Sequence, residues 1–203
     1  IKYINGYPDG TVRPDASITR AEVSAILFRM LSDAQYSTQQ STFPDVAQGA
    51  WYQQSVSYLA SIGIVRGYTD GSFKPDAQIT RAEFAAMVSG FDDMETTEAN
   101  RFGDTAGHWA AAYINNVAAK GWVSGYPDGT YKPDDNMTRA EVVTVVNRML
   151  YRGIEVEDIP QWAPTFGDIT PAHWAYTAVI EAAVGHTFDR KETGYEIWTG
   201  RLN

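Results

Sequence analysis

The stretch Gly6-Tyr-Pro-Asp-Gly-Thr-Val-Arg-Pro-Asp-Ala-Ser-Ile-Thr-Arg-Ala-Glu22 decides the fold, because close copies of it occur twice more in the chain. The copies run from Gly67 to Glu83 and from Gly125 to Glu141, and they keep the same pattern of Gly, Asp, Pro, Thr, Arg and Glu. Recurrence of the same pattern at a period of about 60 residues indicates a repeat protein, whose units bury their apolar faces against one another. The sequence therefore predicts an array of similar units.

A second block recurs out of phase with the first. It is a Phe-x-Asp triplet followed by a Trp, found at Phe43–Asp45 with Trp51, at Phe102–Asp104 with Trp109, and at Phe166–Asp168 with Trp174. The chain consequently opens with the second half of a unit and closes with a first half. Because a half-unit cannot bury its apolar face alone, we expect the two ends to pack together and to close a ring of three units.

These boundaries divide the 203 residues into four segments. Residues 1–42 are the second half of unit 1, residues 43–101 are unit 2, residues 102–165 are unit 3, and residues 166–203 combine the half that completes unit 1 with a polar C-terminal strap. Differences in length fall in linkers such as Asp92–Arg101. The first residue is Ile1, so we expect a fragment or a processed chain, with any signal peptide outside it.

Each unit is expected to contain two helices. One begins at Thr-Arg-Ala-Glu, where the Thr is the N-cap and the Glu completes a capping box, at Thr19 with Glu22, Thr80 with Glu83 and Thr138 with Glu141. The other, in the first half of the unit, follows each Trp and ends near a Gly. For the three Trp residues this pattern favours a position in the core over a role as a ligand platform. The predicted fold class is mainly α, with short hairpin-like turns.

Composition and motifs exclude several classes of function. The formal net charge of −9 argues against a surface for nucleic acid or anionic lipid. The chain has no cysteine for disulfides or thiolate sites, and no apolar run is long enough for membrane insertion. It has neither the ligand spacing of a calcium-binding EF-hand nor a recognisable catalytic motif. We therefore expect a protein that is not an enzyme and has no cofactor, metal site or catalytic residue.

One repeated residue is poorly placed for helix stability. Arg20, Arg81 and Arg139 each occupy the first helical position, where the helix macrodipole disfavours a cation. Two interpretations stay open. The arginines could pair with acidic side chains across a unit boundary, for instance with Asp45, Asp104 or Asp168. Alternatively, they could form anion sites together with the free N–H groups of the helix start.

The combination of these blocks resembles the S-layer homology (SLH) domain family. Ile18–Glu22 and Ile79–Glu83 match its Ile-Thr-Arg-Ala-Glu element fully, and Met137–Glu141 differs only in its first residue. The resemblance implies a pseudo-threefold assembly of three helix–turn–helix units around a central helical bundle. It also implies an extracellular module at the bacterial cell surface that anchors an exported cargo domain to the cell wall without a covalent bond.

The resemblance further implies a partner and a set of ligand-binding residues. The partner would be a secondary cell-wall polysaccharide with a pyruvylated, anionic sugar terminus, or a modified peptidoglycan, held in grooves between units of a monomeric fragment. Arg20, Arg81 and Arg139 would contact the carboxylate, and the candidate set also includes Trp51, Trp109, Trp174, Asp45, Asp104, Asp168, Gly6, Gly67 and Gly125. The alternative is a structural assembly domain that makes protein–protein contacts in a surface layer.

Overall fold

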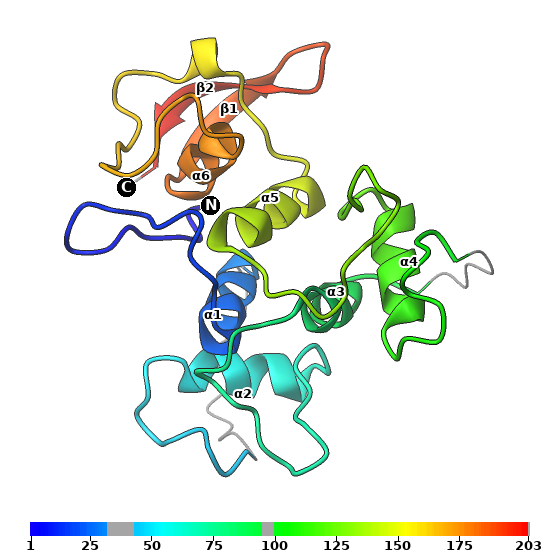
Figure 1. Cartoon of the computed structure of the whole chain (residues 1–203). Helices are drawn as coiled ribbons and strands as arrows, with labels where there is room; N and C mark the ends of the chain where they lie inside the picture. Colours follow the sequence, from blue (N-terminus) through cyan, green and yellow to red (C-terminus); the bar gives the residue numbers. More distant parts are fainter. Residues whose placement is uncertain (32–42, 95–99, 203) are drawn as a thin grey trace. The chain divides into compact units, whose positions relative to one another are not determined.

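The computed structural model describes residues 1–31, 43–94 and 100–202. Its elements are α1 (Arg20–Met30), α2 (Gln53–Ser61), α3 (Arg81–Ser89), α4 (Ala111–Ala119), α5 (Arg139–Met149), the 3-10 helix η1 (Val156–Asp158), α6 (Tyr176–Ala182), β1 (His186–Arg190) and β2 (Glu196–Arg201) (Figure 1). The prediction of a mainly helical fold is confirmed. Residues 32–42 of the first predicted segment, and residues 95–99 of the predicted linker, lie outside the described part.

The chain forms two compact bodies. Ser17–Met137 make up the continuous body, which contains α1 to α4. Ile1–Ala16 and Thr138–Asn203 make up the split body, which contains α5, α6 and both strands. The threefold arrangement of repeats around a central bundle stays a prediction.

Helices α1, α3 and α5 begin as their sequences predict. In each, the Thr side chain accepts a hydrogen bond from the backbone N–H of the Glu three residues later, and the Glu side chain accepts one from the Thr backbone. Each of these caps is worth about 1 kcal/mol of helix stability. The helices bury apolar side chains along most of their length, and they pack in pairs, α1 with α2, α3 with α4 and α5 with α6.

The tryptophans before α2, α4 and α6 are not in the core, which corrects the sequence expectation. Trp51, Trp109 and Trp174 are 64%, 60% and 63% exposed. Each lies two residues before its helix begins, in a turn where helical spacing does not decide which side chains point inward. Helical positions of the same blocks behave as expected, because Val56, Leu59, Ile114 and Val117 are fully buried.

The Gly-Tyr-Pro-Asp-Gly segment forms a tight loop. The N–H of Tyr7 donates to the carbonyl of Thr11, and Gly10 turns the chain with a φ of 79°. Three residues later Arg13 also has a positive φ of 51°, a conformation that costs a non-glycine residue free energy. The corresponding Lys74 and Lys132 have φ values of 56° and 55°, so all three copies share this strained backbone.

The two ends of the chain meet in the split body. The N–H groups of Tyr3 and Ile4 both donate to the carbonyl of Ala182 at the end of α6. The N–H of Gly167 donates to the carbonyl of Gly10, so the two half-units are joined by backbone hydrogen bonds. Each half thereby satisfies polar groups that it could not satisfy alone.

The C-terminal segment differs from the polar strap that the sequence predicted. Strands β1 and β2 pair antiparallel, with His186 opposite Arg201 and Arg190 opposite Glu196. Trp198 of β2 is buried against Ile154, Ile180 and Val184. The segment thus contributes a small apolar core as well as two paired strands.

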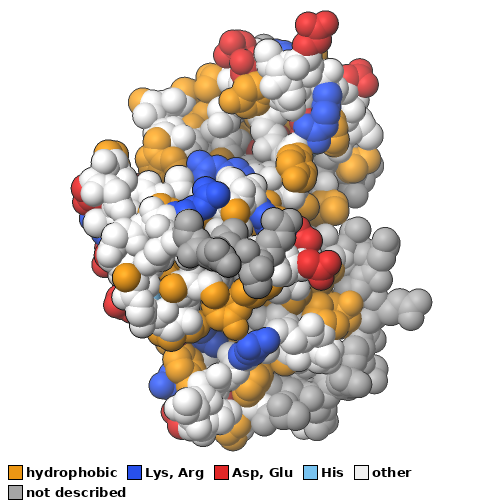
Figure 2. Space-filling model, turned by 90° about the vertical axis from the view of Figure 1, so that its right-hand side faces the viewer, with side chains coloured by type: hydrophobic (Ala, Val, Ile, Leu, Met, Phe, Trp, Pro, Cys, Tyr) orange, Lys and Arg blue, Asp and Glu red, His pale blue; other side chains and the backbone are white. Residues whose placement is uncertain are grey.

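Across the described residues, every helix is too short or too polar to cross a membrane. Figure 2 shows one face of the molecule, on which exposed apolar side chains are scattered among basic and acidic ones.

Candidate functional site

A groove of about 720 Å³ opens on the continuous body. Its walls come from the start of α1, the loop before the second repeat motif, the length of α3 and the start of α4. It brings together three residues of the candidate set, namely Arg20, Gly67 and Trp109. The groove therefore contains an arginine and a tryptophan of the candidate ligand-binding set, and the two come from different repeats of the sequence.

Arg20 is fixed in the wall of this groove. It is only 4% exposed, its Nε donates to the carbonyl of Phe73 over 2.8 Å, and its Nη2 donates to the carbonyl of Arg66 over 3.1 Å. The guanidinium carbon lies 4.7 Å from the centre of the Tyr68 ring and 4.8 Å from that of Phe73, in cation–π geometry. Carbonyl groups and aromatic rings, which carry no net charge, hold the guanidinium in one orientation without neutralising it.

The acidic partner of Arg20 is Glu83. Arg20 Nη1 lies 3.5 Å from Glu83 Oε1. The sequence offered Asp45, Asp104 and Asp168 as examples of partners across a unit boundary, and for Arg20 the partner is instead the capping-box Glu of α3. Glu83 also accepts a hydrogen bond from the Tyr68 hydroxyl. Burial, followed by this hydrogen bond to Glu83, raises the pKa of Tyr68 to about 12.

The aspartates of the Phe-x-Asp triplets hold the strained loops. Asp45 accepts hydrogen bonds from the N–H groups of Phe73 and Lys74 over 2.8 and 2.6 Å. Asp104 and Asp168 make the same pair of bonds, to Tyr131 with Lys132 and to Val12 with Arg13. Burial opposes ionisation of Asp45, but its backbone hydrogen bonds outweigh burial and lower its pKa.

The glycines of the candidate set are required by packing. A Cβ on Gly67 would lie 2.6 Å from Cε1 of Phe43 and 2.9 Å from the carbonyl oxygen of Ser72. A Cβ on Gly6 would meet Phe166 at the same distance, and one on Gly125 would meet Phe102. The Phe of one block therefore packs directly on the Gly of the other. Gly67 also lines the groove.

Trp109 forms the exposed aromatic wall of the groove. Its ring stands beside those of His108 and Tyr113, at centroid distances of 5.6 and 6.4 Å. His108 is oriented by the N–H of Ala110, which donates to its Nδ1, and by Asp134, which lies 3.3 Å from its Nε2. His173 beside Trp174 has the same arrangement with Ala175 and Asp15. These two histidines position the turns that carry the tryptophans.

The surroundings of Arg20 recur around Arg81 and Arg139. Arg81 Nε donates to the carbonyl of Tyr131 over 2.7 Å, and its guanidinium lies 5.0 Å from the Tyr126 ring. In the split body, Arg139 Nη2 donates to the carbonyl of Asn5 over 2.7 Å and lies near Tyr7. Tyr68 was not predicted as a site residue, although the Gly-Tyr pair that contains it recurs in each repeat and could have indicated it. Glu83 was assigned only a capping role, and Tyr113 carries no repeated signature.

Exposed tryptophans, buried arginines stacked on tyrosine rings and capped helices, each in three copies, define a repeat module. The model of the S-layer homology domain matches residues 2–24, 42–85 and 101–143. The chain belongs to the S-layer homology domain family.

Known relatives agree with this assignment. The chain is 37% identical to "Cell surface glycoprotein 1" of Acetivibrio thermocellus, over 94% of this chain and 9% of that protein. It is 33% identical to the "Cellulosome-anchoring protein" of the same organism, over 99% of this chain and 46% of that protein. It is 30% identical to an "S-layer protein" of Bacillus licheniformis, over 70% of this chain and 17% of that protein. The chain therefore spans less than half the length of each of these relatives.

Proposed function

We propose that this chain is a non-catalytic module that anchors a cargo domain to the bacterial cell wall, and that its groove binds the anionic sugar terminus of a cell-wall polysaccharide. Family membership and cell-surface relatives support the anchoring role. The observation that carries the ligand class is the pairing of Arg20 with Trp109 in one groove. A sugar that bears a carboxylate needs both a cation and an apolar face.

The wall of the groove suits a carboxylate more than a neutral group. Arg20 is held by two neutral carbonyls and by Glu83 at 3.5 Å, whose carboxylate also accepts the capping-box hydrogen bond of α3. Charge-assisted hydrogen bonds from a fixed guanidinium to a carboxylate are among the stronger polar contacts in proteins. Because the guanidinium is already ordered, binding costs little side-chain entropy.

The aromatic side of the groove suits the apolar face of a sugar ring. Trp109 is exposed, and Tyr113 stands beside it. Asp92 and Asp93 lie at the rim, and Asp92 is paired with Lys120 over 2.6 Å. That ion pair reduces the repulsion between the rim and an anionic ligand, while carboxylate oxygens can accept hydrogen bonds from sugar hydroxyls.

Sedimentation with purified cell-wall sacculi tests this proposal. We expect the wild-type chain to bind intact sacculi and to lose binding when the secondary polymer is chemically removed. Trp109→Ala should weaken binding without loss of folding, because the side chain is exposed. Tyr151→Ala is the matched control, since Tyr151 is an exposed aromatic residue of the split body, 76% exposed.

Two results would count against the polysaccharide ligand. Undiminished binding to stripped sacculi would identify peptidoglycan as the partner. Absence of binding by a folded wild-type chain to intact sacculi would favour an assembly domain that contacts other proteins of a surface layer.

A further inference from the structure

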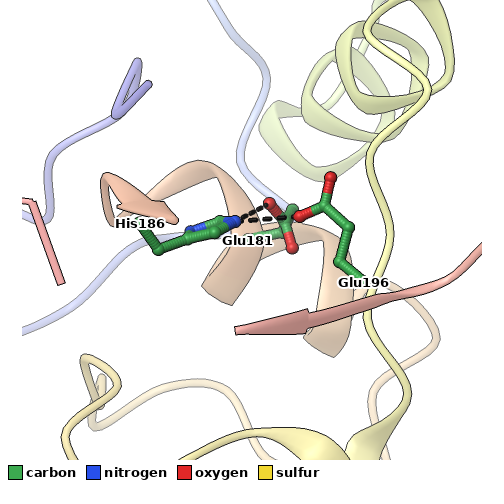
Figure 3. Close-up of side chains that lie close together, drawn as sticks. All are labelled: Glu181, His186 and Glu196. Carbon is green, nitrogen blue, oxygen red and sulfur yellow. Dashed lines mark hydrogen bonds and ion pairs between the residues drawn. The ribbon is translucent and has the colours of Figure 1, made fainter. Parts of the chain in front are cut away.

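A histidine and two glutamates are buried together in the split body, away from the groove. Glu181 comes from α6, His186 from β1 and Glu196 from β2 (Figure 3). The side chains of all three are fully buried. His186 Nε2 lies 3.1 Å from Glu181 Oε1 and 2.9 Å from Glu196 Oε2. These two carboxylate oxygens are acceptors, so a proton on Nε2 can be donated to them.

Arginines also face this cluster. Arg152, in the loop after α5, places Nη2 2.5 Å from Glu181 Oε1 and 3.3 Å from His186 Nε2. Arg190 of β1 places Nη2 3.6 Å from Glu196 Oε1, but its side chain is 41% exposed and its charge is screened by solvent.

The N-terminal segment completes the surroundings. Arg152 Nη1 donates to the carbonyl of Ile1 over 2.5 Å. Tyr3, also buried nearby, donates its hydroxyl proton to Asn147. Residues of α6, both strands, the loop after α5 and the chain start thus converge on one charged cluster.

The indole of Trp198 covers the imidazole. Its ring stacks on His186 at a centroid distance of 4.1 Å, and its Nε1 donates to Glu181 Oε2 over 3.1 Å. An aromatic face favours the charged form of a histidine above it. The indole also keeps water away from the ion pairs, which strengthens every charge interaction in the cluster.

The charges of the buried groups balance when His186 is protonated. Two fully buried carboxylates face one buried guanidinium, and Arg190 reaches Glu196 only from a partly exposed position, so a neutral imidazole would leave the buried negative charge only partly compensated. An uncompensated buried charge is strongly destabilising. A divalent metal would fit this cluster poorly, because it would need the lone pair of Nε2, and Arg152 Nη2 already lies 3.3 Å from that atom.

We propose that protonated His186 is a lock that fastens the C-terminal hairpin, β1 with β2, to α6 and to the start of the chain, and that loss of this proton releases the hairpin. His186 joins Glu196 of the hairpin to Glu181 of α6. Arg152 in turn joins Glu181 to the backbone carbonyl of Ile1. Without the positive charge on the imidazole, the two buried carboxylates repel each other, and the attraction that fastens the hairpin to α6 is lost.

The direction of the pH effect follows from the surroundings. Burial opposes the charged imidazole, but hydrogen bonds to Glu181 and Glu196 outweigh burial and raise the pKa of His186 above 6.5. A group whose pKa is higher in the folded state binds its proton more tightly there. The stability contributed by the lock is therefore fully present below about pH 6.5 and is lost as the pH rises through the pKa of folded His186.

Proton titration of the three histidines by NMR tests the lock in the whole chain. The imidazole signals are followed from pH 5 to pH 10 and assigned with His108→Gln and His173→Gln. We expect the His186 signal to titrate above pH 6.5. Glu196→Gln removes one carboxylate and should weaken proton binding at His186 about tenfold, a shift of about one pH unit. Glu192→Gln, an exposed change in the turn of the same hairpin, should leave the titration unchanged.

Thermal unfolding over the same pH range provides the second readout. The wild-type chain should lose stability as the pH passes the midpoint of His186, and Glu196→Gln should show a smaller loss. A wild-type midpoint at or below pH 6.5 would overturn the proposal without any variant, as would a midpoint that Glu196→Gln does not move. Stabilisation by added Zn²⁺ at neutral pH would also overturn it, because a metal would then occupy the lone pair of Nε2.

Discussion

Arg20, at the first position of α1, forms an ion pair with Glu83, the capping-box residue of α3, with 3.5 Å between Nη1 and Oε1. This pair explains why a cation is tolerated at a helix start. The carboxylate of the next repeat offsets the unfavourable interaction with the macrodipole, and the guanidinium fork satisfies two loop carbonyls. The same residue therefore links two repeats and lines the groove.

Replacement of Arg20 should affect stability as well as binding. Arg20→Ala leaves the carbonyls of Phe73 and Arg66 without their donors, and we expect the free energy of unfolding to fall by about 2–3 kcal/mol. Arg20→Lys keeps the charge but cannot reach both carbonyls, so it should lose part of that stability. Urea unfolding of the three proteins measures the difference. Equal stability of all three would show that the fork is not needed for folding.

Trp109 should matter for binding alone. Trp109→Ala removes an exposed ring that lines the groove, so we expect stability to change by no more than about 0.5 kcal/mol. Affinity for cell-wall polysaccharide should fall about tenfold, which corresponds to about 1.4 kcal/mol of lost stacking. Calorimetric titration with purified polymer measures this change. Affinity equal to that of the wild-type chain would exclude Trp109 from the ligand contact.

Gly67 should tolerate no side chain. Gly67→Ala places a Cβ 2.6 Å from Phe43 Cε1 and 2.9 Å from a backbone oxygen, so we expect a loss of about 1–3 kcal/mol. Gly103→Ala is the matched control, because a Cβ at Gly103 meets nothing within 4 Å. Its effect should stay within about 0.5 kcal/mol. Similar unfolding midpoints for the two variants would contradict the packing role of Gly67.

Asp45 should make stability depend on acid. Its pKa is lowered in the folded state, so its contribution is present above the unfolded pKa of about 3.9 and is lost as the pH falls through the folded pKa. Asp45→Asn should cost about 1–2 kcal/mol at neutral pH, because one of the two loop N–H groups loses its acceptor. The variant should also lose less stability on acidification. Measuring the free energy of unfolding of both proteins at pH 7 and pH 3 tests this. An equal loss of stability in the wild type and in Asp45→Asn would contradict the prediction.

The helices and their caps were predictable because they depend on local chemistry. Thr80 and Glu83 lie three residues apart, and that spacing alone determines both hydrogen bonds of the capping box. The helices that follow each Trp were also predicted, but Trp109 was expected in the core and is exposed. Its orientation depends on His108 and on a turn before the helix, where the period of the sequence pattern no longer applies.

Other features needed contacts between distant residues. Nothing near Arg20 in the sequence indicates Glu83, because the two are 63 positions apart and belong to different repeats. The hairpin was missed because its strands carry charged residues where an apolar alternation would be expected. His186 and Glu196 are buried in it, and only their pairing with Glu181 and Arg152 makes that burial possible.

Chemical-shift mapping with purified cell-wall polysaccharide tests whether the groove lined by Arg20 and Trp109 binds this polymer. In a ¹⁵N-labelled chain, we expect added polymer to shift the indole N–H of Trp109 and the Nε–H of Arg20, while the signal of the buried Trp198 indole stays unchanged. In Trp109→Ala, the change at Arg20 should require about tenfold more polymer. Shifts confined to residues outside the groove, with Arg20 and Trp109 unaffected at saturating polymer, would contradict the account.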